Sequence, residues 1–524
     1  MDVKHKIEIR GRESTARFKM PWKNCISVGR AYDLTRHDLL NHLKFLQDTI
    51  GYRYCRFHAI FDDDMGVVTR GADGSLAFSW HQVDKVYDSL LRIGLKPFVE
   101  LNPMPQALAS GSQTMFHYKM NVTPPASYDE WGWLVREFTK HLVGRYGLEE
   151  VRQWFFEVWN EPNLPAFFSG SKEDYFRLYE VSAQNIRAID PQLKVGGPAT
   201  SKGSWISEFI EYCNSNNVPL DFVSTHLYPQ DEFVTYKNKA ESPHGPGKFF
   251  QDIVRSVSQA VKNSSMPGLP VHWTEWNTQS AINSDSVTWL DNIYVDNIYA
   301  AACIIENCYQ LDNECETFCY WIASDIFFES GLKHSPFSCT YGMLNIYGIP
   351  KASYNAFFLL NKMTGDILET SSSQKLPDGC NTIAVSEAGA IKVLLWNHQA
   401  IEQGPANKPW EGVIEIPAHA DKLIISCKIT INGGSAWEAW QQMGAPGNIT
   451  PMQEEFLYYR SKPIWHCQLM QKENNDLLHI PFILNNNEVT FMEIAPAQKS
   501  ITSPYQNVDN KLYLNTGMGK LDKE

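Results

Sequence analysis

Short apolar runs and longer amphipathic stretches alternate along the first two thirds of this chain of 524 residues. Each run is rich in β-branched or aromatic residues, as a buried strand would be, and each following stretch has the apolar spacing of a helix. Eight such pairs can be counted between about residues 22 and 362. The apolar runs lie at residues 24–31, 52–61, 96–102, 154–161, 194–200, 221–228, 270–277 and 317–325.

This repeated pattern limits the fold to an α/β architecture with parallel strands. Eight strand–helix units in about 340 residues predict a (β/α)8 TIM barrel with insertions. The alternative is an open, doubly wound sheet, but the first apolar run is not followed by a Gly-rich phosphate-binding loop. The barrel is therefore the prediction, with limits at residues 16–362.

The sequence changes character after residue 362. Stretches typical of strands follow one another, joined by Gly, Asn and Pro turns, and they predict a C-terminal β-sandwich over residues 363–504. Residues 1–15 contain a further strand-like segment that is expected to join this sandwich, and the polar tail 505–524 is expected to be loosely ordered. The predicted strands of the sandwich lie within residues 383–397, 411–417, 422–431 and 485–494.

The charge and composition of the chain limit the classes of partner that it is expected to bind. The formal net charge is −13, without a concentrated run of Lys and Arg, which argues against nucleic acid or an anionic membrane surface. The 16 Trp and 23 Tyr are most simply explained as core residues, but flat aromatic rings also stack on sugars. A small carbohydrate is therefore a partner worth testing.

The N-terminal segment and the spacing of the cysteines indicate the cellular compartment in which the protein is expected. The first 22 residues hold no apolar stretch typical of a secretion signal, and no window approaches the roughly 18 apolar residues of a membrane span. The 11 Cys are scattered without metal-ligand spacing, as in a chain with reduced thiols. We expect a cytoplasmic protein without metal or other cofactor.

Two glutamates stand at the ends of predicted strands. Residues 155–164, "FFEVWNEPNL", run an apolar strand directly into Asn160 and Glu161, and "HWTEWN" places Glu275 at the end of the seventh strand. The two glutamates lie 114 residues apart, or three units of about 38, so they should face each other across one opening of the barrel. Cleavage of a glycosidic bond needs two such carboxyl groups.

Each of these residues also has a structural interpretation. One glutamate at a strand end is more often salt-bridged or on the surface, whereas two that are each flanked by Trp and Asn favour catalysis. His226 is equally well explained as a core histidine, Arg56 as a structural ion-pair partner, and Glu100 as a loop anchor. HExxH and GxSxG motifs are absent from the sequence, which argues against a metal centre or a serine nucleophile. The other polar or aromatic groups at strand ends are His58, Asn102, Asn160, Tyr228, Trp321 and Asp325.

Several segments resemble glycoside hydrolase family 39. "WNEPNL" and "TEWN" carry the likeness, and "PFVELNPMPQALASG", "VGGPA", "DFVSTHLYP" and "YGMLNIYGIPK" extend it in the same order. It continues through "AWEAWQQMG" and "NNNEVTFMEI", so it covers nearly the whole chain. The likeness is to the β-xylosidase branch of the family rather than to the α-L-iduronidases.

The resemblance implies roles for the residues around the two carboxylates. Glu161 would be the general acid/base and Glu275 the nucleophile. Asn160 would hydrogen-bond the sugar near its 2-hydroxyl, while His226 and Tyr228 would flank the nucleophile.

The resemblance also implies a sugar subsite. Arg56 and His58 would form its floor, Trp321 would belong to it, and Glu329 would bind the outer hydroxyls of xylose. Two departures border this subsite: Phe328 stands where the xylosidases carry a glutamate, and residues 336–344, "PFSCTYGML", replace a Gly-rich loop.

The predicted function is that of a retaining exo-glycosidase acting on terminal β-D-xylosyl residues by double displacement. The alternatives are a related enzyme for another sugar (an α-L-arabinosidase, β-galactosidase or β-glucosidase), a transglycosylase, or a carbohydrate-binding protein without activity. The sandwich is expected to brace the barrel rather than to bind sugar. A homo-oligomer is compatible with the resemblance.

Overall fold

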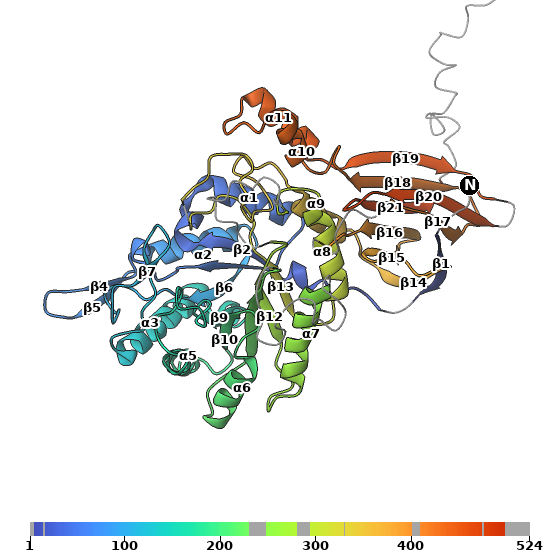
Figure 1. Ribbon diagram of the computed structural model, residues 1–524. Helices are drawn as coiled ribbons and strands as arrows, with labels where there is room; N and C mark the ends of the chain where they lie inside the picture. The colour runs from blue at the N-terminus through green and yellow to red at the C-terminus, as the bar shows by residue number, and fades with distance from the viewer. Residues whose placement is uncertain are drawn as a thin grey trace, which may run out of the picture.

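The protein is described here from a computed structural model. The structure describes residues 5–13, 16–229, 248–279, 294–329, 331–400, 409–473 and 476–497, so the predicted tail at 505–524 lies outside the described residues. Figure 1 shows a barrel of strands and helices on one side and a β-sheet body on the other. In the part of the chain that is described, every helix is too short or too polar to cross a membrane.

The barrel prediction is confirmed. Eight parallel strands close on one another, and each matches one of the predicted apolar runs. In order around the barrel they are β2 (Cys25–Arg30), β3 (Tyr54–His58), β6 (Lys96–Leu101), β9 (Phe155–Val158), β10 (Lys194–Ser201), β11 (Phe222–Leu227), β12 (Val271–Trp276) and β13 (Thr317–Tyr320).

Helices cover the outside of the barrel. Local capping fixes some of their starts: Ser171 and Asp174 form a reciprocal capping box at one helix, and Ser127 accepts a hydrogen bond from the Glu130 N–H at another. These helices are α1 (His37–Thr49), α2 (His81–Arg92), α3 (Tyr128–Tyr146), α4 (Leu148–Val151), α5 (Lys172–Arg187), α6 (Ile206–Ser215), α7 (Phe249–Lys262), α8 (Tyr299–Gln310) and α9 (Ala352–Leu360).

Short hairpins and 3-10 turns lie in the segments that connect the strands and helices of the barrel. Two small hairpins pair β4 (Val68–Arg70) with β5 (Leu76–Phe78) and β7 (Thr114–Met115) with β8 (Met120–Asn121). Three 3-10 turns lie at Pro21–Lys23, Ala31–Thr35 and Asp63–Met65.

The interior of the barrel is divided along its axis. Rings near the amino ends of the strands form an apolar plug, in which Phe98 stacks on Phe155 with centroids 5.0 Å apart and Phe222 packs against both. The polar residues of the same strands lie further along, as Arg56 does on β3 and Glu100 on β6. The plug closes one end of the barrel, so reactive groups gather at the carboxyl end.

The C-terminal body is one nine-stranded sheet that folds over its own core. Residues from both ends of the strand order, such as Ile424 and Ile480, pack in the same apolar cluster, as the two faces of a sandwich would. The strand order is β19 (Ile464–Met470), β18 (Lys422–Ile429), β21 (Val489–Pro496), β16 (Ala390–Asn397), β15 (Cys380–Glu387), β14 (Asp366–Ser372), β1 (Lys6–Glu13), β17 (Trp410–Pro417) and β20 (Leu477–Leu484).

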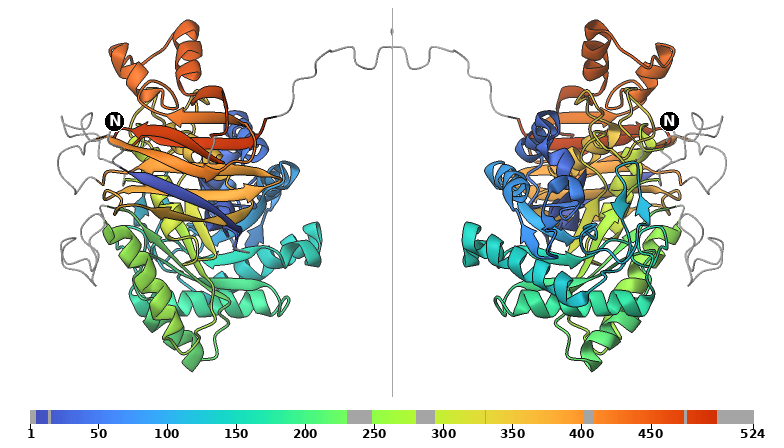
Figure 2. Two further views of the ribbon diagram at one scale, coloured as in Figure 1. Left: turned by 90° about the vertical axis from the view of Figure 1, so that its right-hand side faces the viewer. Right: turned by 90° about the vertical axis from the view of Figure 1, so that its left-hand side faces the viewer.

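The N-terminal strand β1 lies within this sheet. It pairs antiparallel with β14 and parallel with β17, and Figure 2 shows it in blue among the orange and red strands. Strands β14, β19 and β20 were not among the strands predicted from the sequence. The domain boundary near residue 362 stays a prediction, and β14 begins shortly after it.

Two helices, α10 (Trp437–Gln442) and α11 (Pro451–Arg460), lie between β18 and β19 and stand out from the rest of the molecule in Figure 1. A small cluster that includes Trp440 and Leu457 anchors them to Phe337 and Ile349, in the connection that follows the last barrel strand.

Candidate active site

The segment after β9 turns sharply to present a carboxylate. Trp159 and Glu161 both have left-handed backbones, with φ of 69° and 46°, which is uncommon for residues other than glycine. The Trp159 N–H donates to Leu101 O, and the Glu161 N–H donates to Ala199 O, so both neighbouring strands hold the turn. Strained backbone of this kind clusters at functional sites, and here it presents Asn160 and Glu161 at the end of the apolar strand.

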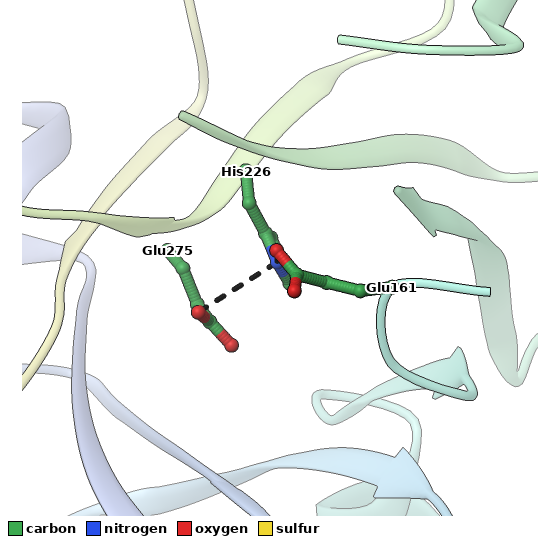
Figure 3. A group of neighbouring side chains, drawn as sticks. All are labelled: Glu161, His226 and Glu275. Carbon is green, nitrogen blue, oxygen red and sulfur yellow. Dashed lines mark hydrogen bonds and ion pairs between the residues drawn. The ribbon is translucent and has the colours of Figure 1, made fainter. Parts of the chain in front are cut away.

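Glu161 and Glu275 face each other across the barrel opening, beside His226 (Figure 3). One oxygen of each carboxyl group and a nitrogen of His226 all lie within 4.8 Å of one another. His226 Nδ1 is 3.1 Å from Glu161 Oε1 and 3.7 Å from Glu275 Oε2. The two glutamate side chains retain 10% and 6% exposure, so a ligand can reach both.

Arg56 is the cation at the centre of the site. Its guanidinium, which is fully buried, donates to Glu275 Oε1 at 2.8 Å and to Asn160 Oδ1 at 2.9 Å. It also contacts the buried carboxylates of Glu157 and Glu100, each at 2.6 Å. A planar guanidinium with five N–H groups can fix several carboxylates at once, and here it orients Glu275.

Two further side chains hold Glu275. The Tyr228 hydroxyl donates to Oε2 at 3.0 Å, and His58 Nε2 lies 3.4 Å from Oε1. His58 Nδ1 is 2.9 Å from Glu100, and the Trp321 ring lies 4.6 Å from the His58 ring, centroid to centroid. Both oxygens of Glu275 therefore have partners that fix the orientation of its carboxyl group.

The pKa of Glu161 is raised to about 7, because burial disfavours its charged form more than the nearby His58 and Arg56 favour it. Burial also lowers the pKa of His58 and that of His226 to about 4. At neutral pH both imidazoles are therefore uncharged, and a large fraction of Glu161 carries its proton.

Glu329 and Phe328 lie at the edge of this group, on the segment after β13. Burial raises the pKa of Glu329 well above its usual value, and the charges of Glu275 and Glu161 add to this effect. Phe328 is partly buried, with its ring centroid 6.3 Å from that of His117 and Arg36 above its face.

The structure thus brings Glu161, Glu275, Asn160 and their predicted neighbours into one network. The predicted neighbours in contact are Arg56, His58, His226, Tyr228 and Trp321.

Two other strand-end residues serve the fold. Asn102 Oδ1 accepts from the Ala59 N–H, and Asp325 pairs with Lys351.

Sequence reasoning missed two buried groups behind the site, Glu157 and Thr274. The Thr274 hydroxyl lies 2.8 Å from Glu157 Oε1 and 3.1 Å from His226 Nε2. A charged residue inside the apolar run "FFEV" was an available signal, because a buried carboxylate needs a partner.

Among the described residues, Glu161, His226 and Glu275 form the one cluster compact enough to share a metal ion. Their facing atoms are already engaged, since Glu161 contacts His226 while Arg56 and Tyr228 bind Glu275. Two carboxyl groups, one bound by a guanidinium and a phenol hydroxyl and the other with a pKa raised to about 7, suit nucleophilic and acid–base chemistry.

A parallel barrel with two opposed carboxyl groups at its carboxyl end defines the class of (β/α)8 glycoside hydrolases. Within that class, the model of the family "Glycosyl hydrolases family 39" matches residues 5–473. The chain belongs to this family and is a glycoside hydrolase.

Curated relatives and solved structures agree with this family. A β-xylosidase of Caldicellulosiruptor saccharolyticus is 38% identical over 491 residues, which cover 93% of this chain and 95% of the relative. A β-xylosidase of Geobacillus stearothermophilus is 34% identical over 513 residues, covering 95% and 97%. The solved structure of a family 39 β-xylosidase from Caulobacter crescentus is 32% identical, covers 94% of this chain and 100% of its own, and has a TM-score of 0.78.

Proposed function

We propose that the protein is a retaining exo-glycosidase that releases terminal β-D-xylosyl residues from xylo-oligosaccharides or related glycosides. The observation that carries the mechanism is the spacing of Glu161 and Glu275, which have carboxyl oxygens within 4.8 Å of each other. Retaining enzymes place the two groups about 5–5.5 Å apart, whereas inverting enzymes need about 6.5–9.5 Å to admit a water molecule. The two β-xylosidases that match more than nine tenths of the chain support the sugar.

In the first step Glu275 attacks the anomeric carbon. The bond from that carbon to the leaving oxygen breaks, Glu161 gives its proton to that oxygen, and a glycosyl ester forms on Glu275. Arg56 and Tyr228 aim Glu275 before the reaction, since each binds a different oxygen of its carboxylate. Asn160, which Arg56 also fixes, is placed to bind a sugar hydroxyl.

In the second step Glu161 takes a proton from water, which attacks the same carbon and releases Glu275. Esterification removes the negative charge of Glu275, and the loss of that charge lowers the pKa of Glu161. The acid of the first step thereby becomes the base of the second. Two inversions at one carbon retain its configuration.

Phe328 and the 336–344 loop favour a second candidate, an enzyme of the same mechanism for another pentose or a hexose. Phe328 lies next to Glu329, the predicted ligand of the outer hydroxyls, and offers an apolar face there. An apolar side chain cannot bind a hydroxyl, so the sugar has to satisfy that edge in another way.

A panel of nitrophenyl glycosides tests both candidates. We expect the highest kcat/KM for the β-D-xyloside among β-xyloside, α-L-arabinoside, β-glucoside, β-galactoside and α-L-iduronide. A higher value for another sugar would overturn the substrate but leave the mechanism. NMR of the sugar released first should show the β-anomer, and the α-anomer would overturn retention. Failure to hydrolyse any of them would favour a binding protein.

A further inference from the structure

Three side chains form a buried row behind Glu161. His226, Thr274 and Glu157 each have 0% exposure, and they come from strands β11, β12 and β9. Glu157 contacts Arg56 and Thr274 contacts His226, each from the side away from the opening, and the mechanism above leaves both Glu157 and Thr274 unused. Their hydrogen bonds nevertheless determine where the proton of His226 lies.

The donors and acceptors in this row can be counted. The Thr274 hydroxyl has one hydrogen and lies 2.8 Å from Glu157 Oε1. Burial alone would raise the pKa of Glu157, but the charge and hydrogen bond of Arg56, together with the other groups around Glu157, outweigh it and leave this pKa below its usual value. Glu157 is therefore a carboxylate that only accepts, and it takes the single hydrogen of Thr274.

His226 then has to donate to Thr274. Its Nε2 is 3.1 Å from Thr274 Oγ1, which has already given its hydrogen to Glu157, so the hydrogen of this contact belongs to Nε2. Arg56 Nη2 also lies 3.4 Å from Nε2, but Nη2 has two shorter contacts, a hydrogen bond to Asn160 Oδ1 at 2.9 Å and an ion pair with Glu100 Oε2 at 2.6 Å. The shorter contact of Nε2 is the one with Thr274, at 3.1 Å.

A neutral imidazole carries one N–H, so a hydrogen on Nε2 leaves Nδ1 as an acceptor. His226 Nδ1 is 3.1 Å from Glu161 Oε1, a distance that needs a hydrogen between the two atoms. That hydrogen comes from the carboxyl group. Glu275 Oε2 lies 3.7 Å from the same nitrogen, which is too far for a hydrogen bond.

We infer that Thr274 and Glu157 are positioning residues, which hold His226 as its Nε2–H tautomer so that Nδ1 accepts the proton of Glu161. This inference rests on the proposed function, since it explains how Glu161 keeps the proton for the leaving group. In the second step the bare Nδ1 faces an ionised Glu161 without donating to it, which makes that carboxylate a stronger base.

Other groups also act on the pKa of Glu161, and their effects should be the same in the wild type and in the Thr274 variants. From the neighbouring strands and loops the groups that face it are Arg56, His58, Glu100, Ser201, Lys202, Tyr228, Glu275 and Glu329. A substitution at Thr274 leaves all of these groups in place. A change in the pH profile of Thr274→Val can therefore be attributed to the hydrogen bonds between His226, Thr274 and Glu157.

The test compares Thr274→Val with Thr274→Ser. Valine keeps the shape but not the hydroxyl, so His226 can turn to its Nδ1–H form, donate to Glu161 and stabilise the carboxylate. For Thr274→Val we expect the high-pH limb of kcat/KM for xylobiose to move down by about one pH unit or more. The loss at neutral pH should be about tenfold for xylobiose and smaller for a dinitrophenyl xyloside, which needs little acid assistance. Thr274→Ser should keep the wild-type limb.

Two outcomes of this comparison would overturn the inference. One is a Thr274→Val profile that falls equally at every pH, because a purely structural role predicts that result. The other is an equal shift in Thr274→Val and Thr274→Ser.

A direct measurement needs neither activity nor a folded Thr274 variant. In wild-type protein labelled with 15N-histidine, with His226 assigned by comparison with His226→Gln, the Nδ1 shift at neutral pH should be that of an unprotonated nitrogen. A protonated Nδ1 would overturn the tautomer. If this measurement agrees but no glycoside is hydrolysed, the proposed function fails while the tautomer stands.

Discussion

Two buried cations, Lys351 and Arg56, each bind several carboxylates at the carboxyl end of the barrel. They differ in whether one of those carboxylates remains accessible to a ligand. Lys351 lies between Asp296 and Asp325, at 2.5 and 2.6 Å, and donates to Thr340 O. Backbone N–H groups occupy the remaining oxygens, Cys339 N–H on Asp296 and Gly342 N–H on Asp325. Every carboxylate oxygen in this cluster is therefore used by the protein, and the cluster fastens the 339–342 loop.

The Arg56 cluster has the opposite character. One guanidinium faces three carboxylates, those of Glu100, Glu157 and Glu275, and the last of these keeps an exposed edge. The two clusters show that a buried ion cluster stabilises a loop when every carboxylate oxygen in it has a partner within the protein. When one carboxylate remains accessible to a ligand, the cluster can instead hold that group for a reaction. The substitutions below probe that distinction within and beside the clusters, and the last of them, at Phe328, lies outside both.

Glu275→Ala should have the largest effect. Loss of the nucleophile removes the covalent route, so kcat on nitrophenyl β-xyloside should fall by about 10⁴-fold or more. The melting temperature should stay close to that of the wild type, since Arg56 keeps two carboxylates. Residual turnover above a hundredth of the wild-type value, or a collapse of the fold, would contradict the division between the clusters.

Glu161→Gln should have the next largest effect, and one that depends on the leaving group. We expect a loss of about 10²- to 10⁴-fold on xylobiose, in line with the usual contribution of a general acid. The first step on a dinitrophenyl xyloside should lose much less, and pre-steady-state release of dinitrophenol measures it. Equal losses on both substrates would reject the acid role.

The pH dependence gives a second readout of the same variant. The pKa of Glu161 is raised to about 7, and the first step needs the protonated form. The kcat/KM of the wild type should therefore fall as the pH rises through about 7. Glu161→Gln cannot ionise, so this limb should be absent from its profile.

Lys351→Met should act on stability more than on chemistry. Removing one partner of a buried ion pair leaves charge uncompensated, which costs about 3–5 kcal/mol of the free energy of unfolding. Urea denaturation measures it, and Asp296→Asn with Asp325→Asn in the same chain should restore part of the loss. As a control, Lys375→Met should change stability by at most about 0.5 kcal/mol, because the Lys375 side chain is 91% exposed.

Phe328→Glu should have the smallest effect. A carboxylate next to Glu329 changes contacts to the outer sugar hydroxyls without touching either ion cluster, so we expect about a tenfold change in the kcat/KM ratio between β-xyloside and the other glycosides. Phe328→Leu should change the ratio less. An unchanged ratio in both variants would remove Phe328 from the sugar subsite.

The barrel could be predicted from the sequence because its signals are local. Each strand is an apolar run of four to eight residues, and each is buried along nearly its whole length. Glu161 and Glu275 could be placed in one opening for a related reason, since parallel strands in a barrel end on the same side.

The parts that were missed depend on distant contacts. Strand β19 is exposed at five central positions and lacks alternation, while β20 carries Pro481 inside its apolar run. The roles of Glu157 and Thr274 depend on their contact with each other, across 117 residues of sequence. They depend also on the contact of Thr274 with His226, across 48 residues. A polar group inside a strand reveals a need for a partner but not which partner.

The place of β1 in the C-terminal sheet sets the order in which the chain can be completed. Ile7 pairs opposite Ser372 and Ile414, so during synthesis β1 has neither neighbouring strand until more than 360 further residues follow it. At about 5–20 residues per second, that wait is on the order of 20 to 70 s. The barrel can assemble in that interval, and β14 and β17 then close the C-terminal sheet around β1.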